Sequence, residues 1–422
     1  MISEALKNRL NASQQTLEAG KFYPHYHSII SRDNDGTAII DDRECLDVST
    51  NSYLSVSQHP KVIAAANAAS SLLGVGSGGS RITSGTTSLH QQLEQRIARF
   101  KGTEDAVLFS SGYLANIGII VALASPPLRS AIRLLDPTVM ESINQPVDLI
   151  FDELVHASII DGIRQATSRL SGGAVEANRF KHRNMDHLEK RLQSSTAPIK
   201  IILTDGVFSL HGRLAPLDKI VALANNYGAA VYVDDAHGAG LYGHTGTGTA
   251  EHFGVEDGVD FNIGTLSKAF GVEGGYITGT HAFCEEMRVQ CRTHVYQTSM
   301  SPGNAAALLE VFDLLEREPW RRTKVLEAAD NINSSLKELG FDTLGCETQI
   351  LPVRFFEEQK AKAAAEILLE RGLFAPAYFA PAVGIDEAMV RINICYAIAK
   401  DESKIEQLLD ALAYAGRTLG VI

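Results

Sequence analysis

A lysine between hydroxyl residues is the most informative chemical feature of the sequence. Lys268 follows Thr265 and Ser267 in the segment GTLSKAFGVEGGY, directly after the apolar run FNIGT (261–265). A lysine amine can form a Schiff base with a carbonyl group, and neighbouring hydroxyl and backbone N–H groups can bind a phosphate. For this segment taken alone, a solvated lysine on a loop is the alternative interpretation.

A carboxylate and a histidine follow a second apolar run. In the segment VYVDDAHGAG, Asp234 ends the run and His237 comes three residues later. A carboxylate in this position can pair with a pyridinium nitrogen and keep it protonated, which makes the ring an electron sink. A metal site built from Asp and His is the alternative. No metal site is predicted, because no further His or Glu cluster lies at ligand spacing.

Three further polar segments follow apolar runs in the same way. Ser111, Gly112 and Tyr113 lie in SSGYLAN after the run AVLF, where the N–H groups at a helix N-terminus would bind an anion. His156 follows the run LIF, and Ser209 follows IKIILT. Each of these residues has a plain structural explanation when taken alone. Together, all five segments come directly after successive predicted strands.

The elements that must position these residues form an alternating pattern. Strands are predicted at 106–109, 149–151, 199–204, 229–233 and 261–265, and a helix is predicted over 88–100. The alternation predicts an α/β fold with a mostly parallel sheet covered on both faces, whose ligands gather at the carboxyl ends of the strands. Three regions are expected: an N-terminal helix and short strands (1–55), a large domain (56–305) and a smaller α+β domain (306–422).

Composition narrows the function classes. The 422 residues include 38 Lys and Arg against 50 Asp and Glu, and this formal charge of −12 argues against a nucleic-acid binder. The five cysteines are scattered and form no close pair, so neither a disulfide framework nor a zinc site is predicted. The polar N-terminus lacks the apolar core of a signal peptide, and no apolar run reaches the roughly 18 residues that span a bilayer. We expect a cytoplasmic enzyme without a transmembrane segment.

Several longer motifs resemble those of a known family. They are NSYLSVSQHP, GSGGSRITSGTTSLHQQLE, FSSGYLAN, HASIIDG, TDGVFSLHGRLAPL, VDDAHGAG, GTLSKAFG, QTSMSP and VRINI. The chain thereby resembles, from about residue 23 to residue 415, the α-oxoamine synthases, which are pyridoxal-phosphate enzymes of aminotransferase class I/II with the aspartate-aminotransferase fold (fold type I). That family includes amino-oxononanoate synthase, aminolevulinate synthase, glycine acetyl-ligase and serine palmitoyltransferase.

The resemblance implies a role for each chemical residue. Lys268 would bind the cofactor as a Schiff base and then act as the base at the substrate Cα. Asp234 would pair with the pyridine nitrogen, and His156 would stack on the ring. The other cofactor contacts would come from His237 and Ser209 at the phenolic oxygen and from Ser111, Gly112, Tyr113, Thr265 and Ser267 around the phosphate and ring.

The resemblance also implies substrate contacts and a partner subunit. Thr298 matches a residue that a neighbouring subunit contributes to the phosphate, which implies a homodimer with shared sites. Arg391 matches the arginine that binds the carboxylate of the amino acid, a task suited to its planar fork. Asn51 matches a residue near the acyl substrate. The implied reaction condenses an amino acid with an acyl thioester and releases carbon dioxide, free thiol and an α-amino ketone.

Departures from the family pattern bear on the acyl group. Residues 395–398 read CYAI where the family has Ser-Ala-Ala-His or similar, and FYPHYH (22–27) replaces an N-terminal arginine. The apolar loop GLFAPAYFAPAVG (372–384) lies where the palmitoyltransferase branch covers its acyl chain, with a surface or core loop as the alternative. An insertion at 126–147 is either a surface element or a contact for a partner or substrate.

These features predict a medium- or long-chain acyl thioester, carried by coenzyme A or an acyl-carrier protein. The amino acid and the carrier stay open. Amino-oxononanoate synthase or glycine acetyl-ligase activity is the nearest alternative, and an aminotransferase or lyase on the same fold is the next. A non-catalytic subunit would lack the Schiff-base lysine, and Lys268 is present.

Overall fold

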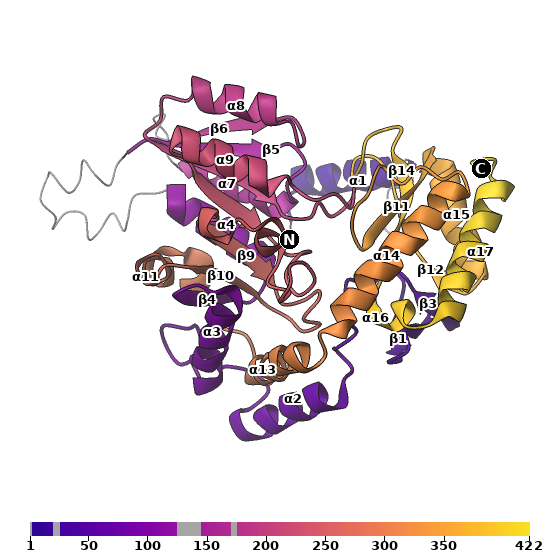
Figure 1. Cartoon of the computed structure of the whole chain (residues 1–422), viewed down its shortest axis with the longest axis horizontal. Helices are drawn as coiled ribbons and strands as arrows, with labels where there is room; N and C mark the ends of the chain where they lie inside the picture. The colour runs from indigo at the N-terminus through magenta and orange to yellow at the C-terminus, as the bar shows by residue number, and fades with distance from the viewer. Residues whose placement is uncertain (1, 20–25, 125–144, 170–174) are drawn as a thin grey trace, which may run out of the picture.

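The computed structural model describes residues 2–19, 26–124, 145–169 and 175–422. Its largest element is a seven-stranded sheet in the order β4-β10-β9-β8-β7-β5-β6 (Figure 1). β10 runs antiparallel to both neighbours, and the other neighbouring pairs are parallel. The strands are β4 (Asp105–Phe109), β5 (Val147–Asp152), β6 (Val175–Phe180), β7 (Ile199–Asp205), β8 (Ala230–Asp234), β9 (Phe261–Thr265) and β10 (Gly275–Gly279).

Helices cover both faces of this sheet, as the alternating pattern predicts. One face packs Ile201 and Ile263 against helices that include α4, α7 and α11, and the other packs Ile202 and Val233 against α8 and α9. The prediction of a mostly parallel sheet covered by helices on both faces is confirmed. The helices of this region are α2 (Pro60–Leu73), α3 (Ser88–Lys101), α4 (Gly112–Ala124), α7 (Ala157–Arg169), α8 (Met185–Ser194), α9 (Leu217–Tyr227), α10 (Thr249–Phe253), η1 (Glu256–Gly258), α11 (His281–Gln290), α12 (Arg292–Val295) and α13 (Pro302–Arg317).

The C-terminal part forms a smaller layered unit (Figure 1). A three-stranded sheet has the order β11-β14-β13, and four helices follow or flank it. These elements are α14 (Trp320–Glu338), β11 (Ile350–Phe356), α15 (Glu358–Glu370), β13 (Ala377–Tyr378), β14 (Ala388–Asn393), α16 (Tyr396–Ala399) and α17 (Glu402–Thr418). The predicted division at 305/306 falls inside α13 and stays a prediction.

The N-terminal strands join the C-terminal region rather than standing alone. The third sheet has the order β1-β2-β3-β12, in which β12 pairs with β3 in parallel, Leu373 opposite Leu46. Its strands are β1 (Ile29–Arg32), β2 (Thr37–Ile40), β3 (Arg43–Asp47) and β12 (Leu373–Phe374), and α1 (Glu4–Ala19) precedes them. No helix in the described part of the chain is long and apolar enough to cross a membrane.

The sheet determines where the five polar segments lie that follow the predicted strands. The strands β4, β5, β7, β8 and β9 share one direction, so the segments that follow them emerge at the same edge of the sheet. The register sets Asp205 at the end of β7 directly opposite Asp234 at the end of β8. The predicted gathering of polar residues at the carboxyl ends of the strands is therefore confirmed as a feature of the fold.

Candidate active site

Lys268 and His237 are brought into direct contact at this edge. The Lys268 Nζ atom lies 2.8 Å from Nε2 of His237, and the other ring nitrogen of His237 lies 2.7 Å from the Tyr53 hydroxyl. Lys268 follows β9 and His237 follows β8, whereas Tyr53 comes from the segment after β3. The three side chains form one connected polar chain, in which Tyr53 and His237 are buried and Lys268 is partly buried.

Burial controls the protonation of this chain. Burial lowers the pKa of Lys268 to about 8, with the Asp234 charge acting in the opposite direction. Burial and the nearby Lys268 charge hold the pKa of His237 well below its usual range. Burial raises the pKa of Tyr53 to about 12. Near neutral pH the site therefore holds a lysine that loses its proton easily, beside a neutral imidazole and a neutral phenol.

Asp234 presents a buried carboxylate with donors on both oxygens. Oδ2 accepts a hydrogen bond of 2.6 Å from Nδ2 of Asn116, and Oδ1 accepts one of 3.0 Å from the backbone N–H of Ala236. Both oxygens of Asp234 therefore act as hydrogen-bond acceptors. Asp234 therefore has the chemistry that a protonated ring nitrogen requires of its partner.

His156 is fixed from two directions. Its Nδ1 lies 2.7 Å from Oγ of Ser158, and its backbone N–H donates to Oδ1 of Asp205 at 3.1 Å. Burial lowers the pKa of His156. The ring of Tyr113 stands edge-on to the imidazole, with 6.4 Å between the centroids. His156 is thus a neutral, oriented aromatic ring at the same edge of the sheet.

Arg391 and Asn51 meet on the side of the C-terminal unit. Nη2 of Arg391, on β14, donates to Oδ1 of Asn51 at 3.2 Å, and the same oxygen accepts from the Tyr53 hydroxyl at 3.2 Å. The Arg391 side chain is buried, yet its Nε atom has no hydrogen-bond partner among the described residues. A buried guanidinium nitrogen without an acceptor is the group that a substrate carboxylate would satisfy.

The residues expected around the phosphate also gather together. The Oγ1 atom of Thr265 lies 2.8 Å from Oγ of Ser267, and Oγ of Ser111 accepts from the backbone N–H of Leu114 at the start of α4. A Cβ atom added at Gly112 would lie 3.2 Å from Cβ of Thr265. A glycine at this position keeps the backbone N–H groups of the helix start open to an anion. These residues fit a phosphate group.

The remaining expected residues have less defined surroundings. Tyr113 is about half-exposed, and its hydroxyl donates to Asp161 at 2.5 Å. Ser209 lies in the turn after β7, and its contact with the cofactor stays a prediction. The insertion at 126–147 lies mostly outside the described residues, as do residues 22–25 of FYPHYH, so the expectations on them stay untested.

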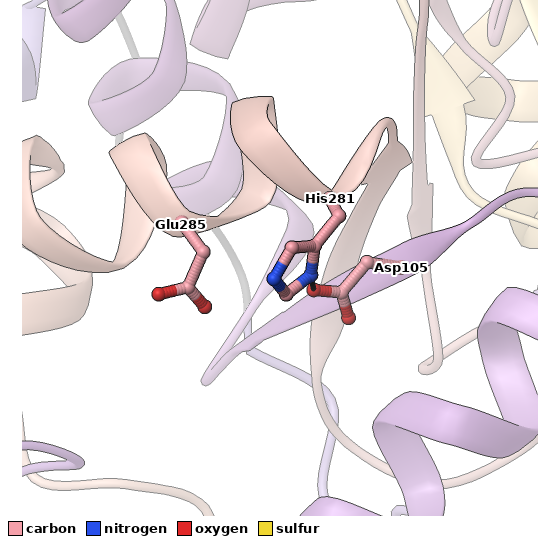
Figure 2. A group of neighbouring side chains, drawn as sticks. All are labelled: Asp105, His281 and Glu285. Carbon is pink, nitrogen blue, oxygen red and sulfur yellow. Dashed lines mark hydrogen bonds and ion pairs between the residues drawn. The ribbon is translucent and has the colours of Figure 1, made fainter.

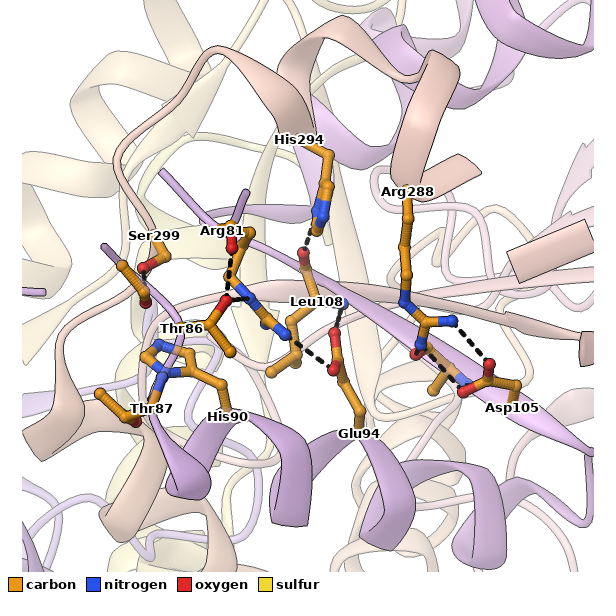
Figure 3. A network of polar contacts seen from close by, with 12 residues as sticks. Arg81, Thr86, Thr87, His90, Glu94, Asp105, Leu108, Arg288, His294 and Ser299 are labelled. Carbon is orange, nitrogen blue, oxygen red and sulfur yellow. Dashed lines mark hydrogen bonds and ion pairs between the residues drawn. The ribbon is translucent and has the colours of Figure 1, made fainter. Parts of the chain in front are cut away.

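Thr298 lies beside the motif GSGGSRITSGTTSLHQQLE. Its backbone forms an isolated bridge with Ser80, and its carbonyl accepts from the Ser110 hydroxyl at 3.2 Å. The surrounding network is shown in Figure 3: Arg81 pairs with the buried Glu94 at 2.8 Å, and Glu94 accepts from the N–H of Leu108 on β4. The motif therefore ties α3 and the segment containing Thr298 to the edge of the sheet.

Among the residues that the structure describes, one group of three potential metal ligands lies outside this site. Asp105, His281 and Glu285 lie together near the surface (Figure 2). The Asp105 carboxylate, however, already accepts two hydrogen bonds from Arg288, at 2.7 and 3.0 Å. The charge of Asp105 is thereby balanced by a guanidinium, so the group has a complete explanation as an ion-pair cluster.

Four further residues of the site lie inside the motifs that resemble the family but have no predicted role: Tyr53, Asn116, Ser158 and Asp205. Gln349 lies outside those motifs. Gln349 donates to the His237 carbonyl at 2.9 Å and accepts from the Tyr242 hydroxyl at 3.2 Å. The partners of these residues are set by tertiary contacts that sequence spacing does not reveal.

The apolar loop at 372–384 is partly core and partly site. Leu373 is fully buried in the main apolar core, which agrees with the alternative prediction of a core loop. Tyr378 instead pairs with Met389 on β14, two residues before Arg391. The part of the loop around Tyr378 therefore lies beside the strand that carries Arg391, whereas its start lies in the core.

The fold and the site together define a pyridoxal-phosphate-dependent enzyme of fold type I. A profile of the family "Aminotransferase class I and II" matches residues 43–412. The chain belongs to this family and, within it, to the α-oxoamine synthases, which are C-acyltransferases.

Relatives with curated names are similar over most of the chain. The 8-amino-7-oxononanoate synthase of Symbiobacterium thermophilum is 39% identical over 387 residues, covering 91% of this chain and 92% of that protein. The protein of the same name from Thermosipho melanesiensis is 36% identical over 387 residues, covering 91% of both chains.

Solved structures are similar over 89% or more of this chain. A serine palmitoyltransferase from S. paucimobilis has a TM-score of 0.87 at 30% identity and covers 100% of both chains. The Sphingomonas wittichii serine palmitoyltransferase has the same TM-score and identity over 99% of both chains. An 8-amino-7-oxononanoate synthase from Francisella tularensis, with a TM-score of 0.71 at 22% identity, shares the fold.

Proposed function

We propose that this α-oxoamine synthase condenses an amino acid held by Arg391 with a medium- or long-chain acyl thioester, and that Lys268 is its catalytic base. The observation that carries the proposal is the buried Nε of Arg391, which has no acceptor among the described residues. Its neighbour Nη2 is already held by Asn51, so the guanidinium is oriented before a substrate arrives. The substrate carboxylate accepts from Nε.

Lys268 is suited to remove a proton from the substrate Cα. The pKa of Lys268, lowered to about 8 by burial, leaves a useful fraction of neutral amine near neutral pH. His237, 2.8 Å away, accepts a hydrogen bond from the lysine whenever the lysine is protonated. Tyr53 holds the other ring nitrogen at 2.7 Å, so the imidazole keeps one orientation while the proton moves.

Pyridoxal phosphate, when bound, supplies a ring that withdraws electrons from the substrate Cα. Asp234 would hold the ring nitrogen, His156 would lie against the ring, and Ser111, Gly112, Thr265 and Ser267 would hold the phosphate. His237, with Ser209, would contact the phenolic oxygen. The donors to Asp234 and the close approach of Gly112 to Thr265 support this assignment.

Two protomers would share their sites. Thr298 lies beside Ser110, next to the phosphate residues, and its segment is tied to the motif at 76–94. We assign its hydroxyl to the phosphate of the partner subunit. Co-expression of Lys268→Ala and Thr298→Ala chains tests this: hybrid dimers should regain activity at one site, whereas no gain over either variant alone excludes a shared site.

The acyl group is assigned from the loop that follows α15. Tyr378 approaches the site beside β14, and Phe379 lies within the same apolar stretch. A second candidate is a dicarboxylic acyl group, which the names of the 8-amino-7-oxononanoate synthase relatives, at up to 39% identity over 91% of the chain, favour.

The reaction is tested by measuring products. Release of carbon dioxide and free thiol should require both an amino acid and an acyl thioester. Transfer of the amino group to a keto acid without thiol release would instead indicate an aminotransferase.

A further inference from the structure

A buried hydrogen-bond network links two of the proposed cofactor contacts. The side chain of Asn116, on α4, donates through Nδ2 to Asp234 Oδ2 at 2.6 Å and to Ser158 Oγ at 2.8 Å. The Tyr232 hydroxyl donates to Asn116 Oδ1 at 2.6 Å. All four side chains are almost completely excluded from solvent, so water does not compete for these bonds.

The direction of each hydrogen bond follows from the chemistry of the groups. An ionised carboxylate only accepts, so Asp234 must face the amide nitrogen of Asn116 and not its oxygen. The Asn116 oxygen then faces Tyr232. Burial, followed by the Asp234 charge, raises the pKa of Tyr232 well above its usual range, so this phenol keeps its proton and donates. Both hydrogens of the Asn116 amide are thereby directed to Asp234 and Ser158.

The same logic extends to the imidazole of His156. The Ser158 oxygen accepts from Asn116, so its own hydrogen is free to donate to Nδ1 of His156, 2.7 Å away. The backbone N–H of Ser158 also points to this nitrogen, at 3.3 Å. Nδ1 is therefore an acceptor. A neutral imidazole with an accepting Nδ1 carries its proton on Nε2.

We propose that Asn116 is a positioning residue for His156. Its bond to Asp234 orients the amide so that it also donates to Ser158, and the Ser158 hydroxyl then donates to Nδ1 of His156. This arrangement fixes the His156 tautomer with its proton on Nε2. The inference rests on the proposed function for the importance of Asp234 and His156, but the network itself belongs to the protein without any ligand. Asn116 thus couples the group proposed to hold the ring nitrogen to the group proposed to lie against the ring.

The test is the ¹⁵N spectrum of the His156 imidazole in the full-length protein, recorded with and without pyridoxal phosphate and assigned with His156→Gln. We expect Nδ1 to show the shift of an unprotonated nitrogen and Nε2 that of a protonated one. Asn116→Asp keeps the shape of the side chain but removes both N–H donors of the amide. The Ser158 hydroxyl is then expected to turn toward the new carboxylate. The Nδ1–H population should then rise about five- to thirtyfold, the usual worth of one lost buried hydrogen bond.

Two variants separate this effect from general damage. Asn262→Asp introduces the same change at a buried asparagine on β9, where Asn262 pairs in register with Val233 and not with Asp234, and it should leave the His156 signals unchanged. Ser158→Ala removes only the branch to His156 and should shift the tautomer without weakening the Asn116–Asp234 bond. It keeps the proposal testable if Asn116→Asp does not fold.

The outcomes are distinct from those of the proposed function. A wild-type His156 with its proton on Nδ1, or unchanged His156 signals in both Asn116→Asp and Ser158→Ala, would overturn the inference. If the tautomer shifts as expected in the ligand-free protein while exchange of the α-proton of every amino acid is absent, the network stands and the proposed function fails.

Discussion

Asp205 and Asp234 are register partners at the ends of the parallel strands β7 and β8, and both carboxyl groups are buried. Their surroundings differ. Asp234 receives donors on both oxygens, whereas burial and the neighbouring Asp234 charge raise the pKa of Asp205 well above its usual range. The two neighbouring carboxyl groups thus differ in their surroundings: Asp234 has donors on both oxygens, whereas the burial of Asp205 favours its protonated form.

This relationship predicts a pH-dependent stability. Because the folded protein keeps the Asp205 proton over a pH range where the unfolded chain has lost it, the free energy of unfolding falls as pH rises through that range. Asp205→Asn keeps the acceptor for the His156 N–H and removes the titration. We expect the variant to have the higher thermal midpoint at about pH 8 and the difference to shrink toward about pH 4. A variant less stable than the wild type at every pH contradicts a neutral Asp205.

The second prediction concerns Lys268. The purified protein should be yellow, and borohydride should attach the cofactor to Lys268, whose lowered pKa makes the amine a nucleophile. Peptide mapping by mass spectrometry identifies the labelled residue. Lys101 is an internal control, because it is also buried but paired with Asp235 at 3.5 Å. Label on Lys101 or on any lysine other than Lys268 would refute the assignment.

Asp234→Asn tests the partner of the ring nitrogen. The asparagine oxygen can still accept from Asn116, so the fold and some cofactor binding should persist. Without the negative charge the ring nitrogen loses its proton, and removal of the substrate α-proton should slow by orders of magnitude, with about 1.4 kcal/mol of barrier for each factor of ten. The measurement is deuterium exchange at Cα of the amino acid. Exchange at a near-normal rate would show that another group carries this role.

Arg391→Lys tests the carboxylate contact. Lysine keeps the charge but loses the planar fork and the hydrogen bond to Asn51. The dissociation constant of the amino acid, measured from its spectral change, should rise at least about tenfold, whereas cofactor content should stay the same. Arg354→Lys is a matched control on the neighbouring strand β11, where the guanidinium pairs with Asp342. Equal effects of the two variants would be evidence against a specific role for Arg391.

The last prediction concerns acyl chain length. Each buried methylene is worth about 0.8 kcal/mol, so an acyl chain bound against the apolar residues around Tyr378 should raise kcat/KM several-fold per carbon until the apolar surface is covered. The assay compares acyl-CoA chains from acetyl to palmitoyl, with the best amino acid present. A maximum at acetyl or succinyl contradicts the assignment. A strong preference for a chain ending in a carboxylate would favour the 8-amino-7-oxononanoate synthase type.

The sequence predicts the main sheet well because most of its strands are short, mostly apolar runs bounded by turns. The runs at 106–109, 149–151 and 261–265 all lie within observed strands. β6 reads VEANRF and is largely exposed, so its pattern resembles a loop. β10 begins at Gly275, where a Cβ would lie 2.5 Å from the backbone nitrogen of Gly112, so the strand requires a residue that disfavours strands in isolation.

The residues of the site likewise fall into those that the sequence predicts and those that it does not. The position of Lys268, Asp234, His156 and His237 at one edge of the sheet is predictable, because each ends or follows a strand; their roles stay a prediction. The positions of Tyr53 and Asn116 are not predictable, because one comes from the N-terminal segment and the other lies on a helix that is apolar nearly all round. Buried polar partners of this kind are defined by what they touch in three dimensions.

The pairing of β12 with β3 also determines the order in which the parts of the chain can fold during synthesis. During synthesis Leu46 emerges early and its partner Leu373 emerges near the end, so the edge of β3 stays open while most of the chain is made. Pairings between distant parts of a chain form slowly, and open strand edges favour aggregation. The segment that carries Asn51 therefore meets Arg391 only in the last stage of folding, and a nascent or truncated chain ending before β12 holds a nearly finished sheet but no amino-acid site.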